Sequence, residues 1–251
     1  MPRLTVTRVA HACALLDFGG ARILTDPWFS ERRFYRHGEP RAVSGAADLP
    51  ELAGVVISHE HYDHCDLDAL AAYPDKSVPF AVAAGIGARV RAAGFPNVVE
   101  LDPWQRTRLG PVEVIATPAS HGVHEVTFVL RMDGHTVYFG ADTRRVGELD
   151  DIARRFPEID LALLPINGLR IRPFGRQVVM DAAEAAEFTG VLRPGVAVPI
   201  HYAFTAGPLG DRLMIDAVRD RPDLYRDAAT DLAPGTRVEI LPTGRPFRVP
   251  V

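Results

Sequence analysis

The chain has 251 residues, of which 47% are hydrophobic and 24% charged, which is ordinary globular composition and excludes a disordered chain. The net charge is −4 and the arginines are scattered, so we expect no nucleic-acid partner. There is no apolar run of about 18 residues and no signal-peptide pattern, and Cys13 and Cys65 form no disulfide framework. We therefore predict a cytoplasmic protein with no transmembrane segment and a single domain over residues 1–251.

The first half of the chain is predicted to consist mainly of strands. Gly19-Gly20 and Asp133-Gly134 are two-residue turn signals that predict hairpins. The segment Trp28–Arg36 follows neither strand nor helix periodicity, so a loop is expected there. The expected strands are Leu4–Val9, Ala14–Phe18, Arg22–Thr25, Gly54–Ser58, Val78–Ala83, Val98–Leu101, Val112–Thr117, Val126–Met132 and Thr136–Phe139, with helices at Asp66–Tyr73 and Ile86–Ala93.

The second half alternates helices with strands. Helices are expected at Glu148–Phe156, Met180–Leu192 and Asp211–Arg219, and strands at Ile159–Leu164, Gly195–Ile200, Arg237–Leu241 and Phe247–Val249. Strands followed by two blocks of alternating strands and helices favour a sheet-on-sheet core with helices outside.

Residue types that bind metals follow the strand that ends at Ser58. His59, His61, Asp63 and His64 lie within six residues, and each type can ligate a divalent cation. Alternate side chains of an extended backbone share a face, so His59, His61 and Asp63 can project together, and a turn would bring in His64. A solvated polar loop between a strand and a helix is the alternative interpretation.

These residues resemble a known family. His59-Glu60-His61-Tyr62-Asp63-His64 matches the HxHxDH motif of the metallo-β-lactamase superfamily. Three later segments, each after a predicted strand, resemble its remaining ligand positions: Ser120-His121-Gly122, Gly140-Ala141-Asp142-Thr143 and Pro199-Ile200-His201-Tyr202. The resemblance covers nearly the whole chain and implies an α/β fold, the four-layer αββα sandwich.

The same resemblance implies a site for two divalent metal ions. One ion would be held by His59, His61 and His121, the other by Asp63, His64 and His201, and Asp142 would bridge them. The second ion is expected to bind more weakly. Zinc is the expected metal, with manganese or iron as alternatives, because histidine and carboxylate suit all three.

A pair of such ions implies hydrolysis of a small-molecule substrate. Bound metal can lower the pKa of water from about 15.7 to about 7, so we expect a metal-bridging hydroxide to attack an ester, lactone or phosphodiester centre. Asp63 would orient the hydroxide and relay its proton. A metal-dependent redox enzyme on the same fold is the alternative, because fold does not dictate reaction, and iron would favour it. A non-catalytic binding module is disfavoured because no expected ligand is missing.

Looser matches indicate one branch of the superfamily. Val9-Ala10-His11-Ala12, the run Leu24–Trp28 and the predicted helix Ala182–Glu187 look like the branch that contains ascorbate-6-phosphate lactonase and N-acyl-phosphatidylethanolamine phospholipase D. This branch mixes lactone and phosphodiester substrates, so the resemblance does not fix the reaction.

Several further residues have two interpretations. Asp26, at a strand end, either accepts the other N–H of a metal-bound histidine or caps a turn. His11 either reaches the pocket or is a structural histidine at a strand end. His124 either contacts substrate or occupies a surface turn, and His37 and His135 are expected in loops.

Two groups of residues could shape the substrate site. Arg170, Arg172 and Arg176 lie on a loop, where they either recognise an anionic substrate or are simply solvated. The candidates for an apolar pocket lip are Tyr202, Phe204, Trp28, Phe29, Phe34 and Tyr35, with core packing as the alternative for Phe29. Cys13 and Cys65 are expected to be small buried apolar residues.

Overall fold

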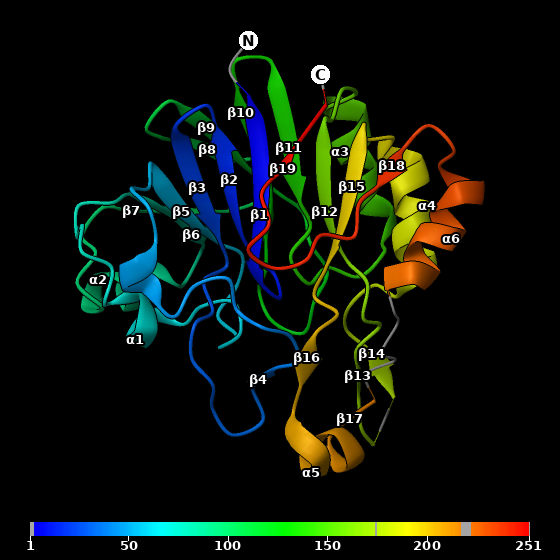
Figure 1. Ribbon diagram of the computed structural model, residues 1–251, viewed down its shortest axis with the longest axis horizontal. Coiled ribbons are helices and arrows are strands. Elements are labelled where there is room, and N and C mark those ends of the chain that lie inside the picture. Colours follow the sequence, from blue (N-terminus) through cyan, green and yellow to red (C-terminus); the bar gives the residue numbers. More distant parts are fainter. Residues whose placement is uncertain (1–2, 174, 217–221, 251) are drawn as a thin grey trace.

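Two seven-stranded sheets pack face to face in the computed structural model, which describes residues 3–173, 175–216 and 222–250 (Figure 1). The first sheet contains, in spatial order, β19 (Phe247–Arg248), β1 (Leu4–Ala10), β2 (Cys13–Phe18), β3 (Ala21–Thr25), β5 (Gly54–Ile57), β6 (Phe80–Ala83) and β7 (Val98–Leu101). The second contains β18 (Arg237–Val238), β15 (Val196–Ile200), β12 (Leu161–Pro165), β11 (His135–Phe139), β10 (Thr127–Met132), β9 (Val112–Thr117) and β8 (Arg106–Leu109).

The two sheets are built in the same way. In the first, β1, β2 and β3 form an antiparallel meander, and β5, β6 and β7 then add in parallel to β3. In the second, β8 to β11 are antiparallel, and β12, β15 and β18 add in parallel to β11. Alternate strands of a meander run the same way, so β1, β3 and β5 end at one edge of their sheet, and β9, β11 and β15 end at one edge of theirs.

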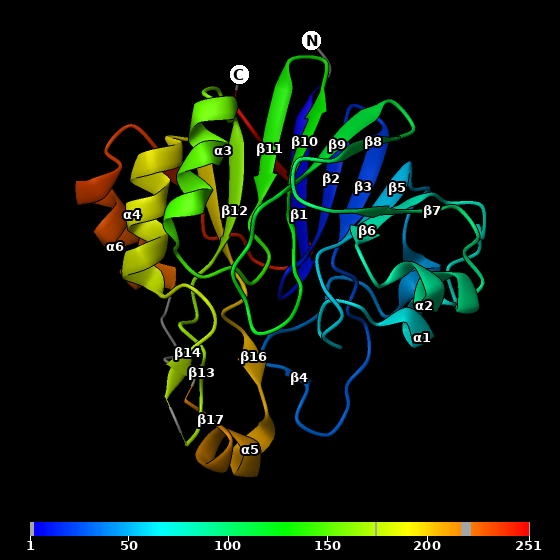
Figure 2. The ribbon, with the colours of Figure 1, turned by 180° about the vertical axis from the view of Figure 1, so that it is seen from behind.

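The core lies between the sheets, and helices cover their outer faces. Along β12, Leu161 and Leu163 face the first sheet, whereas Ala162 and Leu164 pack against the helices, as the two-residue period of a strand requires. The first sheet carries α1 (Leu67–Leu70), α2 (Gly87–Ala92) and the 3-10 turn η1 (Ala46–Asp48); the second carries η2 (Gly147–Leu149), α3 (Asp150–Arg155), α4 (Ala182–Leu192) and α6 (Pro222–Leu232) (Figure 2). The predicted αββα sandwich is confirmed.

Short elements form a separate layer beyond one end of the sandwich, at the bottom of Figure 1. This layer, called the lobe below, contains β4 (Arg36–His37), β13 (Arg170–Ile171), β14 (Arg176–Gln177), β16 (Phe204–Thr205), α5 (Gly207–Leu213) and β17 (Ile215–Asp216). β4 pairs with β16, and β13 lies between β14 and β17. The lobe therefore joins three chain segments that are far apart in sequence.

Several element predictions were wrong in extent. The helix expected over Asp66–Tyr73 is the single turn α1: the Asp66 carboxylate caps its start at the Ala69 N–H, and the helix already ends at Leu70, before Tyr73. The helix expected at Asp211–Arg219 is α5, which ends at Leu213 before β17; residues 217–219 of that prediction lie outside the described residues. The prediction missed β8, which is mainly polar, and α6, which begins at a proline.

His135 was expected in a loop, but it lies buried in β11, and the predicted turn signal Asp133-Gly134 directly precedes it. The described part of the chain has no helix with the length and apolar character that a bilayer crossing needs.

Candidate metal centre

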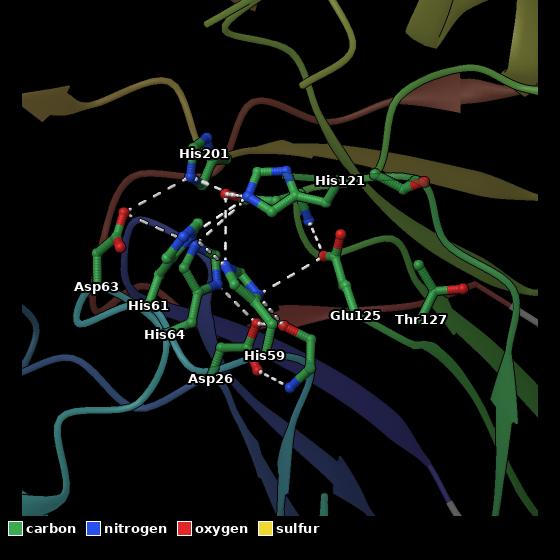
Figure 3. Close-up of polar contacts among 12 residues, drawn as sticks. Asp26, His59, His61, Asp63, His64, His121, Glu125, Thr127 and His201 are labelled. Carbon is green, nitrogen blue, oxygen red and sulfur yellow. Dashed lines mark hydrogen bonds and ion pairs between the residues drawn. The ribbon is translucent and has the colours of Figure 1, made fainter. Parts of the chain in front are cut away.

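The candidate ligands all follow the carboxyl ends of strands that run in the same direction within their sheets. His11 follows β1, Asp26 follows β3, His59 to His64 follow β5, His121 follows β9, Asp142 follows β11 and His201 follows β15. Beyond the strand ends the backbone no longer pairs with a neighbouring strand, so it can turn and direct polar side chains towards a common point. The structure brings all seven predicted metal ligands together at this edge, and all of them except Asp142 are labelled in Figure 3.

Three imidazoles and one carboxylate form a first group. His59 Nε2 lies 2.9 Å from His61 Nδ1, and His121 Nε2 lies 3.2 Å from the same atom. Asp142 Oδ2 is 3.9 Å from both His59 Nε2 and His121 Nε2. Ligands on a tetrahedral zinc, with Zn–N of about 2.0–2.1 Å, are roughly 3.3 Å apart, so these atoms are spaced for one ion.

A second group adjoins the first and includes a residue whose role the sequence left open. His11 Nε2 lies 3.3 Å from Asp63 Oδ2, and His64 Nε2 lies 3.7 Å from that oxygen. Asp142 Oδ1 is 2.8 Å from His201 Nε2 and 3.2 Å from His64 Nε2. His11 is therefore a fourth residue of this group, and Asp142 presents one oxygen to each group.

Hydrogen bonds fix which ring nitrogen faces the centre. Asp26 accepts from His64 Nδ1 at 2.7 Å, and the Val178 carbonyl accepts from His121 Nδ1 at 2.7 Å. The Ser58 hydroxyl donates to Asp26 at 2.6 Å and so accepts from His59 Nδ1 at 2.9 Å. Each of these rings thus keeps its Nε2 lone pair for the centre, as metal-binding histidines require.

Buried polar atoms without partners also fit a bound cation. Within the described part of the chain, His11 Nε2, His64 Nε2, His201 Nε2 and Asp142 Oδ1 are buried and make no hydrogen bond of normal geometry. Buried polar atoms are almost always paired in folded proteins, so four such atoms in one group need an explanation. A divalent ion accepts electron pairs from all of them.

Backbone strain is concentrated at the same edge. Eight described non-glycine residues have positive φ, and four of them are at the centre: His11 (54°), Asp26 (32°), Ala141 (44°) and His201 (58°). Each such conformation costs on the order of 1–3 kcal/mol and persists only where the surroundings enforce it. Strands with partners on both sides supply that enforcement.

The electrostatics favour positive charge at His64 in the second group. Burial lowers the pKa of His59, His61 and His121, so these rings are neutral near pH 7. Burial would also lower the pKa of His64, but Asp142 and Asp63 raise it well above its usual value. The two carboxylates thus attract a cation, and a metal ion can supply the charge that a proton otherwise brings.

Glu125, which the sequence analysis missed, supports both groups. Its buried Oε1 accepts the N–H of Asp142 at 2.8 Å and lies 3.7 Å from His59 Nδ1 (Figure 3). Burial raises the pKa of this carboxyl well above its usual value. The available signal was an acid directly before an apolar strand, four residues after His121.

A cavity of about 370 Å³ opens onto the centre. His61, Asp63, His121 and Asp142 form its polar end. The remaining lining comes from the predicted lip residues Phe34, Tyr35 and Phe204, and from Gly122, Val123, Leu169, Ile171, Val178, Ala206, Met214 and Ile215.

Three residues expected at the lip lie elsewhere. Trp28 is buried and stacks on His37 with ring centroids 3.8 Å apart, so His37 is a packed residue of β4 rather than a loop residue. Phe29 packs in the core, which was the alternative for it. The Tyr202 hydroxyl accepts a 2.6 Å hydrogen bond from the buried Arg8 and does not line the cavity.

The remaining candidates lie outside the cavity. Arg170, Arg172 and Arg176 are exposed and none lines the cavity, although their neighbours Leu169 and Ile171 do. The His124 side chain is 51% exposed and lies 3.8 Å from Asp102, which favours the surface-turn interpretation. Cys13 and Cys65 are buried free thiols, as expected, and burial raises the pKa of Cys65 to about 12.

The layered fold and the two adjoining groups of histidines and carboxylates define a metalloprotein of the metallo-β-lactamase fold. The chain belongs to the beta-lactamase superfamily, because residues 21–202 match the family described as "Beta-lactamase superfamily domain". This confirms the resemblance drawn from the HxHxDH motif. The lactonase and phospholipase branch stays a prediction.

Relatives and a solved structure agree with this family. A metal-dependent hydrolase of Deinococcus radiodurans is 30% identical over 219 residues, covering 83% of this chain and 88% of that protein. An uncharacterized protein of Mycobacterium tuberculosis is 32% identical over 223 residues, and the match spans 80% of this chain but only 59% of that protein's length. Igni18, a metallo hydrolase from Ignicoccus hospitalis, has the same fold, with a TM-score of 0.76 at 22% identity over 99% of both chains.

Proposed function

We propose that this protein is a dinuclear metallohydrolase that cleaves an ester, lactone or phosphodiester bond in a small molecule. The observation that carries the proposal is Asp142, which presents Oδ2 to the first group and Oδ1 to the second. A carboxylate between two histidine-rich groups suits a pair of ions about 3.5–4 Å apart. Family membership and the names of the relatives support the coarser statement, a metal-dependent hydrolase.

Divalent ions in the two groups would supply a water of lowered pKa as nucleophile and stabilise negative charge that develops on the substrate. His59, His61, His121 and Asp142 would hold one ion, and His11, Asp63, His64 and His201, with Asp142, the other. Zinc suits these nitrogen and oxygen donors, and manganese or iron are alternatives.

Asp63 is the residue that handles the proton. It lies at the polar end of the cavity, and neighbouring His64 and His11 outweigh the effect of burial and hold the pKa of its carboxyl well below the usual range. Asp63 is therefore ionised at neutral pH, and its carboxylate accepts a hydrogen bond from the attacking water. In this role it orients the water and passes its proton towards the leaving group.

Tyr35 is the donor that the cavity offers to a substrate oxygen. Among the described lining residues, it is the only one outside the two metal groups with a polar side chain. Its ring is fixed edge-on to Phe204 and Tyr62, with centroid distances of 5.8 and 5.6 Å. Burial raises the pKa of its phenol, so the hydroxyl stays protonated and can donate to the oxygen on which charge develops.

Elemental analysis of protein purified without added metal tests this function. We expect two ions per chain, and titration of metal-free protein with zinc or manganese should show unequal affinities. His61→Ala and His201→Ala should each remove one of the two binding steps, whereas the matched control His124→Ala, at an exposed histidine, should keep both. Two equal and inseparable steps, or one ion per chain, would contradict the dinuclear proposal.

The alternative, a metal-dependent redox enzyme, predicts a different metal and consumption of oxygen. Bound iron together with oxygen consumption on substrate addition would support it. Hydrolysis of lactone, ester or phosphodiester test substrates by the zinc or manganese form, without oxygen uptake, would exclude it.

A further inference from the structure

We propose that the cavity selects small neutral substrates that carry an apolar alkyl or aryl group beside the hydrolysed bond. This inference rests on the proposed function and narrows it, because it favours substrates with an apolar substituent over those with a carboxylate or phosphate substituent in the same place.

The wall of the cavity is apolar once the metal groups and the Tyr35 hydroxyl are set aside. Phe34 comes from the loop before β4, Leu169 and Ile171 from the start of the β13 hairpin, and Phe204 and Met214 from the two sides of α5. Small-molecule sites have volumes of about 300–1,000 Å³, so a cavity of about 370 Å³ is of the size that takes a small molecule.

The strand period decides which side chains of β13 face the substrate. In Leu169-Arg170-Ile171-Arg172 the apolar residues alternate with the arginines, and alternate side chains of a strand point to opposite faces. Leu169 and Ile171 line the cavity, and the exposed Arg170 donates to Gln177 Oε1 at 3.1 Å. Arg170 and Arg172 therefore lie on the face away from the substrate. Arg176 is paired with Ile171 across the hairpin and shares its face, but Arg176 is exposed and does not line the cavity.

A charged substituent would find no partner along the apolar wall. No arginine or lysine lines the cavity within the described residues. A carboxylate or phosphate placed against Phe34, Ile171 and Met214 would lose water without gaining a hydrogen-bonded countercharge, which is strongly unfavourable. An alkyl or aryl group in the same place gains from the transfer out of water.

Hydrolysis of p-nitrophenyl acetate, butyrate and hexanoate by the zinc-loaded protein tests this directly. Each methylene that the wall removes from water should raise kcat/KM by about fourfold until the cavity is full. The mono-p-nitrophenyl ester of glutaric acid is close to the hexanoate in length but ends in a carboxylate, and its kcat/KM should be at least about tenfold lower than that of the hexanoate.

A matched pair of variants assigns the preference to the wall. Ile171, at the cavity mouth, is 49% exposed, and Leu209, in the same lobe but outside the cavity, is 60% exposed, so serine at either site should leave the fold intact. Ile171→Ser should lower the hexanoate-to-acetate ratio by about fivefold, and Leu209→Ser should leave it unchanged. Ile171→Arg should shift the preference towards the glutarate ester.

A binding measurement separates this inference from the proposed function. Acetophenone, hexanophenone and 6-oxo-6-phenylhexanoate cannot be hydrolysed, and their affinities can be measured by calorimetry. Tighter binding of hexanophenone than of the other two supports the apolar wall even if no ester is cleaved, an outcome that counts against the proposed function alone. Tighter binding of the carboxylate, or hydrolysis with no dependence on chain length, overturns the inference and leaves the hydrolase assignment in place.

Discussion

The metal centre and the cavity wall are built in different ways. The centre follows strands hydrogen-bonded within the large sheets, and its candidate ligands are buried, apart from the half-buried His61 and His121. The wall comes largely from the lobe, whose strands have two residues each and whose Ile171 and Met214 are about half exposed. Side chains that must converge on a metal ion follow strands of the large sheets, whereas those that only need to exclude water lie on the more exposed lobe.

This difference indicates that chemistry and selectivity can change separately. A substitution at the sheet edge disturbs residues that share hydrogen bonds, as Asp26 does with Ser58 and His64. A substitution in the lobe changes one contact with the substrate. Variants of the two regions should therefore fall into two classes, those that lose turnover or metal and those that change only the preferred substrate.

The largest effect is expected at Asp63. Asp63→Ala removes the carboxylate that we propose orients the water and carries its proton, so kcat should fall by about 10²–10⁴. Turnover at saturating zinc is the measurement, and thermal unfolding checks that the fold is retained. Near-normal hydrolysis by this variant would reject the role given to Asp63.

Tyr35 tests whether the wall also contributes to chemistry. Tyr35→Phe keeps the ring against Phe204 but removes the hydroxyl, so kcat should fall on the order of 10²-fold while KM changes little. Steady-state kinetics separate the two constants. An increase in KM alone would show that the hydroxyl only binds substrate.

Asp26 tests whether a change at the metal centre leaves the substrate preference unchanged. Asp26→Asn keeps the size of the side chain but removes the charge that faces His64 Nδ1, which should weaken metal binding by about 10–100-fold. Competition with a chromophoric chelator measures this affinity. The order of preference among the p-nitrophenyl esters should stay as in the wild type, and unchanged metal affinity would leave Asp26 with only the turn-capping role.

The smallest effect is expected at His124. Its side chain is 51% exposed and lies outside both the metal groups and the cavity, so His124→Ala should change kcat/KM by less than about twofold. A larger loss in the ester assay would mean that substrate extends beyond the cavity described above.

The sequence predicted the fold and the main ligands because their signals are local. Strand and helix periods revealed most elements of the sandwich, and four ligands lie within His59–His64. The roles of His11 and Glu125 could not be predicted, because each is a single residue with no metal-binding motif around it. Their contacts with the ligands depend on the folded structure. The two-residue strands of the lobe form only because segments distant in sequence pair with one another, so no periodic run of residues predicts them.

The segment around β13 contained a further signal in the sequence, beyond the charge of its arginines. The alternation Leu169-Arg170-Ile171-Arg172 assigns opposite faces to the two residue types. It could not show which face meets the cavity, because this depends on how β13 pairs with β17. In that pairing Ile171 lies opposite Ile215, which is 44 residues further along the chain.

Each group of ligands draws on both sheets. His59 and His61 follow a strand of the first sheet and meet His121 and Asp142 from the second; His11, Asp63 and His64 likewise meet His201. Metal ions would therefore clamp the two halves of the sandwich together, and neither half could form a complete coordination sphere on its own. Because an unfolded chain has no preformed sphere, free metal at about 100 times its Kd would add roughly 2.7 kcal/mol per ion to the unfolding free energy, so the same ions that activate water would also act as a crosslink across the core.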